Sequence, residues 1–385
     1  MRAVVLKDAG LAKRAGQFAW LSIDTDRPAN EAFNARFPST GVPLFLIIDP
    51  KTEKALISWY GTASAEQLGR LLDDGLAAGK PKKPGSPEAL LAGADALNVA
   101  GKLTEAGAAY MAALKAGGRS WARYSRAAES MMLAYELSGD RAGGTRAALE
   151  VAPTLARDQS FVNVMRVGIQ SAASEVETTV DGSKQFAPVP AHLAILKPLA
   201  IEALAVPGGF ADDKAMIYSA LLGIERKAGN EAGIKRTAQE MWDFLARAAD
   251  ASRSAEVRSS LSGFMRSAAM DLDDVARMAP IYEALEKELP QDYGPPQALA
   301  SLYLQLGRPG DALAAYKRAY ERARGEGVKA AQILMSCASL QVKLGDRAGA
   351  KASLDQMGRL VESLPEPQAA RYRTQIKTLL DKLGG

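Results

Sequence analysis

The sequence predicts a small α/β module over residues 1–79, followed by an all-α helical solenoid over residues 88–385. β-Branched runs mix with helical patterns in the first segment, whereas the second is rich in Ala and Leu and has helical periodicity almost throughout. Between them, residues 80–87 read KPKKPGSP, a composition typical of a hydrated linker. We therefore expect two domains joined by this linker.

Composition narrows the chemistry that the chain can perform. Its 385 residues carry a net charge of +4 without a basic block, so nucleic-acid binding is not favoured. The single cysteine, Cys337, excludes an internal disulfide, a four-cysteine zinc site and a two-cysteine redox motif. The single histidine, His192, excludes paired-histidine metal ligation. We expect no catalytic, cofactor-binding or metal residues, and no apolar run approaches the roughly 18–20 residues of a membrane span.

The first segment has the order helix, strand, helix, strand, strand, helix. Apolar spacing predicts its helices, and β-branched or aromatic runs predict its strands. Ser64 and Gln67 form a capping box, which marks the start of the last helix. In chain order, the expected elements are residues 4–15, 18–24, 30–37, 42–49, 55–60 and 64–76.

Residues 1–77 resemble the latter part of a thioredoxin domain. The resemblance rests on the runs SIDTD, PANEAFNARFPSTGVPLFLIIDP and LISWYGTASAEQLGRLLDDGL. In that family a Gly-Val-Pro with a cis proline opens a strand, and here the matching residues are Gly41, Val42 and Pro43. The resemblance implies that this loop pairs with an extended peptide substrate. The alternative is a plain X-Pro turn before a strand.

The chain lacks the opening strand of that family and its Cys-x-x-Cys. Thiol–disulfide exchange needs an activated thiolate and a second, resolving thiol, and residues 1–79 contain no sulfur except that of Met1. The chain as given is therefore expected to be redox-inactive. Two hypotheses follow: either a Cys-x-x-Cys lies upstream of Met1 and the complete protein is a thiol–disulfide oxidoreductase of cell redox homeostasis, or the module only packs or binds.

The second segment contains the repeated pattern G-x4-A-x3-Y/L. Its clearest copies begin at Gly101 and Gly307, with others at Gly139 and Gly345 and a weaker one at Gly229. Gly101 and Gly139 are 38 residues apart, and so are Gly307 and Gly345. The pattern resembles tetratricopeptide (TPR) repeats, in which small residues let paired helices approach and an aromatic side chain fills the gap between them.

This second resemblance covers residues 88–155 and 210–364. Residues 159–209, which are rich in proline and polar residues, are expected to form an irregular insert, and residues 368–383 are expected to form a capping helix. Arrays of this kind have a concave face, and the resemblance implies that partner proteins or peptides bind there. The main interpretation is a thioredoxin-family protein with a TPR interaction region, and the alternative is a non-catalytic TPR scaffold or adaptor.

Other candidate residues have simpler explanations. The G-x-G-x-x-A run at residues 325–330 follows a helix instead of a strand, so a dinucleotide site is not predicted. A clamp for the C-terminal carboxylate of a peptide would need Lys and Asn in the first helix of the first repeat, but these positions hold Leu91 and Asp95. Such a clamp is therefore not predicted there. The combination of a thioredoxin module with a TPR region resembles bacterial proteins that are often exported. This resemblance implies a periplasmic location if an upstream extension carries a signal peptide.

Overall fold

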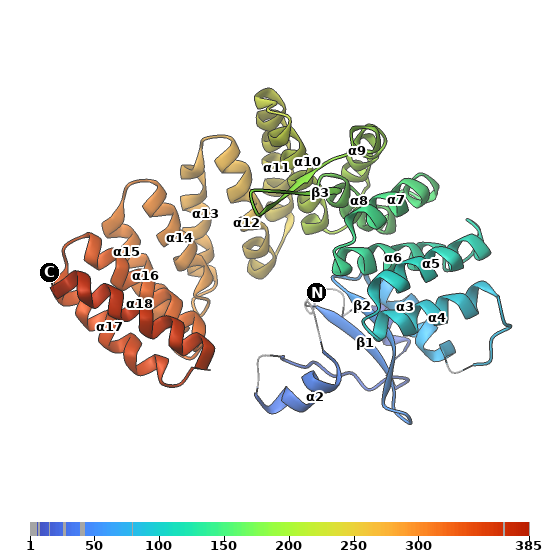
Figure 1. The fold of residues 1–385 in the computed structure, drawn as a ribbon, viewed down its shortest axis with the longest axis horizontal. Helices are drawn as coiled ribbons and strands as arrows, with labels where there is room; N and C mark the ends of the chain where they lie inside the picture. Colours follow the sequence, from blue (N-terminus) through green and yellow to red (C-terminus); the bar gives the residue numbers. More distant parts are fainter. Residues whose placement is uncertain are drawn as a thin grey trace. The chain divides into compact units, whose positions relative to one another are not determined.

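The structure is a computed structural model of the chain, and it describes residues 6, 8–14, 16–25, 28–38, 43–78, 80–364 and 366–384. The chain folds as two compact units, Met1–Ala228 and Gly229–Gly385 (Figure 1). The first unit contains the α/β segment together with the first helices of the helical region. The domain boundary expected at residues 80–87 stays a prediction.

The α/β segment is built around one antiparallel hairpin and one helix. Strands β1 (Leu44–Asp49) and β2 (Lys54–Tyr60) pair so that Leu44 lies opposite Tyr60. Helix α3 (Ala65–Ala78) follows, and its predicted capping box is confirmed, because Ser64 Oγ accepts from the Gln67 amide at 3.1 Å and Gln67 Oε1 accepts from the Ser64 amide at 2.7 Å. Two short helices, α1 (Ala9–Ala12) and α2 (Glu31–Arg36), precede the hairpin.

The strand expected over residues 18–24 is absent. Only Phe18 makes an isolated bridge, and the side chains of Trp20 and Leu21 are 49% and 79% exposed. A strand needs a continuous run of backbone hydrogen bonds to a neighbour, which an isolated bridge does not supply, and the sheet of β1 and β2 has two strands among the described residues. The thioredoxin fold implied by the resemblance is therefore not shown by the described part of the chain.

The helical part of the first unit consists of consecutive helices that pack on one another. The turn glycines Gly101 and Gly139 both have φ of +72°, the left-handed conformation that favours glycine at the end of a helix. The repeat pattern therefore marks the sharp turns between paired helices. The helices are α4 (Pro87–Val99), α5 (Leu103–Gly117), α6 (Tyr124–Ser138), α7 (Arg141–Val151), α8 (Gln159–Ala172), α9 (Pro190–Ala205) and α10 (Ala211–Lys227).

Residues 159–209 are regular, which corrects the expected irregular insert. They form α8, a hairpin of β3 (Val176–Val180) and β4 (Ser183–Ala187), and α9. Pro190 begins α9, where a missing backbone N–H costs nothing, while Pro198 lies inside the helix. The prolines therefore mark a helix start at Pro190 and a position inside a continuous helix at Pro198, and composition alone did not distinguish these from an irregular loop.

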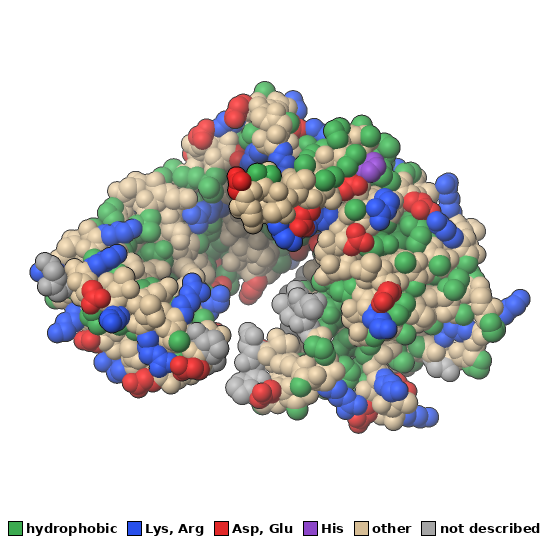
Figure 2. Space-filling model, in the orientation of Figure 1, with side chains coloured by type: hydrophobic (Ala, Val, Ile, Leu, Met, Phe, Trp, Pro, Cys, Tyr) green, Lys and Arg blue, Asp and Glu red, His purple; other side chains and the backbone are tan. Residues whose placement is uncertain are grey.

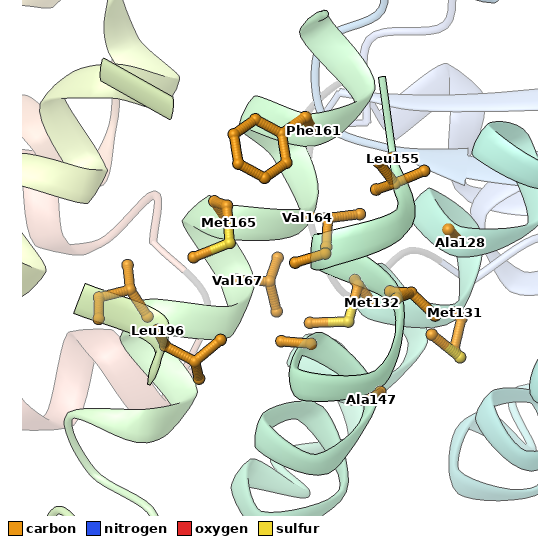
Figure 3. Close-up of a cluster of buried hydrophobic side chains, with 14 of the residues drawn as sticks. Ala128, Met131, Met132, Ala147, Leu155, Phe161, Val164, Met165, Val167 and Leu196 are labelled. Atoms are coloured by element: carbon orange, nitrogen blue, oxygen red, sulfur yellow. The ribbon is translucent and has the colours of Figure 1, made fainter. Parts of the chain in front are cut away.

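The core of this helical part is apolar and tightly packed (Figure 3). Phe161, Val164 and Met165 of α8 meet Met132 of α6 and Leu196 of α9 in one buried cluster. The close approach of α7 and α8 depends on a glycine, since a Cβ added at residue 168 would lie 2.6 Å from the Cβ of residue 148. Small residues thus set the distance between the helices, as the repeat pattern predicts.

The second unit continues with eight helices along its described residues. Each packs mainly on its neighbours in sequence, and the last helix also packs against α16. The predicted C-terminal helix is present as that last helix. None of the described helices has the length and apolarity needed to cross a membrane. The helices are α11 (Glu231–Ala251), α12 (Ala255–Asp271), α13 (Ala279–Glu288), α14 (Gly294–Gln305), α15 (Pro309–Ala323), α16 (Val328–Lys343), α17 (Arg347–Val361) and α18 (Glu366–Gly384).

Candidate interaction face

Some even-numbered helices pack directly on one another within each unit. In the first unit α6 packs on α8 and α8 on α10, and in the second α16 packs on α18. Residues 10, 6 and 3 positions before each turn glycine share one face of their helix, because steps of three and four residues return to the same side. We call these positions the inner face. They are Leu91, Asp95 and Asn98 in α4; Glu129, Leu133 and Glu136 in α6; Gln297, Ser301 and Leu304 in α14; and Met335, Ser339 and Val342 in α16.

Part of the inner face of α4 and α6 contacts the α/β segment. Asn98 Nδ2 donates to Ser58 Oγ of β2 at 2.9 Å, and Gln67 Nε2 of α3 donates to Glu129 Oε2 at 2.5 Å. The side chain of Leu133 packs against the core of the α/β segment. These contacts leave Asn98 and Glu129 only 7% and 1% exposed, so no partner reaches them in this structure.

Two arginines of this region meet carboxylates from α3 and α4. Arg123 Nε donates to Asp74 Oδ1 at 2.6 Å, and Arg126 Nη1 lies 2.9 Å from Asp95 Oδ1. The Tyr110 hydroxyl also donates to Asp95 Oδ1, at 2.7 Å. Burial raises the pKa of Asp95 although Arg126 acts in the opposite direction. Arg126 is itself almost fully buried, so this group of charges is held away from solvent.

Glu129 begins a partly buried chain of hydrogen-bonded polar side chains. Asn163 Nδ2 donates to Glu129 Oε2 at 2.8 Å, and Gln159 Nε2 in turn donates to Asn163 Oδ1 at 2.7 Å and to Asp213 Oδ2 at 2.8 Å. Burial raises the pKa of Glu129 to about 7 and that of Asp213 to about 6. The chain joins α3, α6, α8 and α10, so burial and hydrogen bonding make it a structural link between these helices.

Catalytic chemistry finds little support among the described residues. They contain no group of three or more His, Cys, Asp or Glu side chains arranged to hold a metal. Cys337 is buried in α16, and burial raises the pKa of its thiol to about 12, which disfavours the reactive thiolate. His192 Nδ1 lies 2.8 Å from Glu175 Oε2 and ties the start of α9 to the residue before β3.

The inner face of the second unit differs, because its side chains reach solvent. Leu304 is 41% exposed, and Gln297, Ser301, Met335 and Ser339 are half-buried. Helix α14 contains no charged residue between Gly294 and Gln305. The Ser301 hydroxyl donates only to the backbone carbonyl of Gln297 in its own helix, at 3.2 Å. The open face therefore offers amide, hydroxyl and apolar groups without a charge.

A second apolar surface lies along α9. An open hollow of about 620 Å³ is bordered by α9 and by Ile224 of α10. Ile195 and Ile201 are 52% and 54% exposed, and hydrophobic side chains gather over α9, while charges of both signs are scattered over the rest of the visible face (Figure 2). Nothing in the structure shows what covers this surface.

The loop predicted to bind a peptide is only partly described. Gly41 and Val42 lie outside the described residues. The carbonyl oxygen of Pro43 accepts from the Gly61 amide at 2.9 Å, which closes the open end of the β1–β2 hairpin. Peptide binding at this loop stays a prediction.

The contact between α3 and α6 was not predicted, although the sequence contains part of its signal. Gln67 and Asp74 are seven residues apart and lie on one face of α3. Arg123, Arg126 and Glu129 are spaced by three residues and lie on one face of α6. Each set indicates a polar stripe, but neither stripe identifies the other as its partner.

No protein-family model matches the chain, and no curated protein matches it in sequence. Similar solved structures include a tetratricopeptide repeat protein from Parabacteroides merdae, at 12% identity and a TM-score of 0.35 over 78% of this chain and 99% of that one. The TPR2AB-domain:pHSP90 complex of yeast Sti1 has 14% identity and a TM-score of 0.29 over 78% and 98%. The assembly chaperone of RpL4, Acl4, has 13% identity and a TM-score of 0.35 over 78% and 100%. At these TM-scores, the likeness does not establish a shared fold or function.

Proposed function

We propose that this protein is a non-catalytic scaffold of the tetratricopeptide type, and that it binds partner proteins or peptides at the inner face of α14 and α16. One observation carries the proposal. The inner-face positions of α14 and α16 are half-buried or exposed, whereas Asn98, Glu129 and Leu133 on the inner face of α4 and α6 contact the chain's own α/β segment. The repeat pattern at Gly307 and Gly345 supports the tetratricopeptide assignment.

The composition of the open face favours an uncharged peptide segment. Gln297 and Ser301 carry groups that both donate and accept hydrogen bonds, which suits the backbone of a peptide. Leu304, which is 41% exposed, offers an apolar contact, while Met335 is half-buried because it also packs against the core of α16–α18. Because α14 has no charge, we expect binding to depend only weakly on salt concentration.

Panning a displayed library of random peptides against the full chain tests this function. Peptides that are enriched should lose most of their affinity for a Leu304→Glu variant in a fluorescence-anisotropy titration, because the substitution places a charge on the open face. Leu344→Glu is the matched control, since Leu344 is 44% exposed but lies outside the inner face. Equal affinity for both variants, or a library without enriched peptides, would contradict the proposal.

The thioredoxin-family function receives no support from the described residues. The α/β segment has a two-stranded sheet, and the only thiol of the sequence is buried in α16. That function now depends on the Cys-x-x-Cys expected upstream of Met1. Sequencing of the upstream coding DNA and the intact mass of the native protein test it, and the chain as given should be inactive in insulin reduction.

A further inference from the structure

We propose that the α/β segment is a built-in ligand of the inner face of α4 and α6, docked through a separable interface. The proposal also names the chemistry that this face recognises: a helix that presents a carboxamide and, two turns later, a carboxylate. In this structure α3 is that helix, with Gln67 and Asp74 in the two places. The inference does not depend on the function proposed for the second unit.

The α/β segment and the helices α4–α10 have separate hydrophobic cores, which supports docking of the segment on these helices instead of one shared core. The core of the α/β segment is one buried cluster, and the core of the helices α4–α10 is another. Leu133 and Phe210 are the side chains of the helical region that pack against the first cluster. The covalent connection is the linker at residues 80–86, which is rich in Pro, Lys and Gly. The segment thus has its own core and a hydrated tether.

The interface between these cores combines the apolar contacts of Leu133 and Phe210 with polar bonds that have a defined direction. Gln67, near the start of α3, bonds to Glu129, and Asp74, near its end, bonds to Arg123 at the start of α6. The two helices therefore run antiparallel. Asp74 also lies 3.6 Å from Arg126. The Asp74 carboxylate of α3 thus faces two guanidinium groups, and the Gln67 carboxamide of the same helix donates to the buried carboxyl of Glu129. These two contacts explain why a helix with a carboxamide and a carboxylate two turns apart is recognised.

The interface is also incompletely satisfied. Among the described residues, the buried side-chain atoms without a hydrogen-bond partner all belong to this interface or to adjacent side chains. These atoms are Asp74 Oδ2, Asn98 Oδ1, the three guanidinium nitrogens of Arg126, Glu129 Oε1, Ser130 Oγ and Ser160 Oγ. Arg126 is nevertheless ion-paired, since its Nη1 lies 2.9 Å from Asp95 Oδ1 and its Nε lies 3.6 Å from Asp74 Oδ2. A buried polar atom without any partner costs about 1–3 kcal/mol, so a partner helix that also satisfies Asn98 Oδ1 would compete with α3.

Cleavage of the linker tests whether the segment is a ligand. A specific protease site is placed at residues 80–85 of the full chain, and the nicked protein is followed by size-exclusion chromatography across a dilution series. The N-terminal fragment should co-elute with the remainder. Asp74→Ala removes the charged hydrogen bond to Arg123, so the fragment should dissociate with a Kd raised about tenfold or more. Asp74→Asn tests the same charge with little change in shape.

Asp73→Ala is the matched control, because Asp73 pairs with Arg14 inside the α/β segment at 2.6 Å. It should leave the Kd of the nicked protein unchanged. A synthetic peptide of residues 62–80 should displace the fragment from the nicked protein, and the same peptide with Asp74→Ala should not. Circular dichroism confirms that the variants keep their helices.

Three outcomes overturn the proposal. A fragment that leaves the unsubstituted nicked protein at micromolar concentration shows that the segment is not a ligand. A fragment that leaves only when the whole chain unfolds shows that the segment belongs to one inseparable core. Failure of the peptide to displace the fragment shows that α3 is not the recognised element.

Discussion

Ionisation of Glu129 should make the first unit less stable as pH rises. Its carboxyl is 1% exposed and accepts hydrogen bonds from Gln67 at 2.5 Å and Asn163 at 2.8 Å, both at Oε2. Burial raises its pKa from an ordinary 4.5 to about 7. The folded state therefore binds a proton more tightly than the unfolded chain does. Stability is fully present below about pH 4.5 and decreases until about pH 7, by up to about 3 kcal/mol.

Glu129→Gln removes this charge and keeps an oxygen that accepts from Gln67 and Asn163. We expect the variant to match the unsubstituted chain near pH 5 and to exceed its free energy of unfolding by up to about 3 kcal/mol at pH 8. Urea unfolding followed by tryptophan fluorescence reports on the first unit, which holds three of the four tryptophans.

Other buried carboxyls, including that of Asp213, also change stability with pH, so the informative quantity is the difference between the Glu129→Gln variant and the unsubstituted chain at each pH. Glu66→Gln is the control, because the Glu66 side chain is 80% exposed. A difference that stays constant from pH 5 to pH 8 would refute the assignment of a raised pKa to Glu129.

Three further results are expected. Tyr110→Phe should destabilise the first unit by about 1–3 kcal/mol in urea unfolding, because Asp95 loses a buried donor; an unchanged midpoint would show that this bond adds nothing. Gly168→Ala should cost about 1–3 kcal/mol through its close approach to α7. Gly223→Ala, with no atom within 4 Å of the new Cβ, should be neutral or stabilising by up to about 1 kcal/mol, and a reversed order in thermal unfolding would disprove the packing argument. Cys337 should react with a thiol reagent only in denaturant, and rapid labelling of the native protein would contradict its burial.

Local signals in the sequence predicted local structure well. The spacing of Ser64 and Gln67 correctly located the start of α3, and the repeat glycines Gly101 and Gly139, noted in the sequence only for their spacing, prove to end two helices. These features depend on backbone conformation and on hydrogen bonds between residues three positions apart. The strand expected at residues 18–24 failed for the opposite reason, since a strand forms only with a partner strand elsewhere in the chain.

The candidate faces were not predictable because they depend on distant pairings. Gln67 and Glu129 are 62 residues apart, and their stripes indicate polarity without naming a partner. The inner-face position ten residues before the turn glycine is buried in α6, where it is Glu129, and half-buried in α14, where it is Gln297. Both helices nevertheless carry the same repeat pattern. Burial here is decided by whether the α/β segment lies on the face, and periodicity carries no information about that.

The uncharged surface of α14 has a consequence for engineering. Leu304 is 41% exposed, Gln297 is half-buried, and the hydroxyl of Ser301 donates to the carbonyl of Gln297 in its own helix. Charged residues can therefore be introduced at these positions one at a time while the buried residues Leu299 and Leu302 are kept. The same helix would then present a surface whose binding specificity is changed by design.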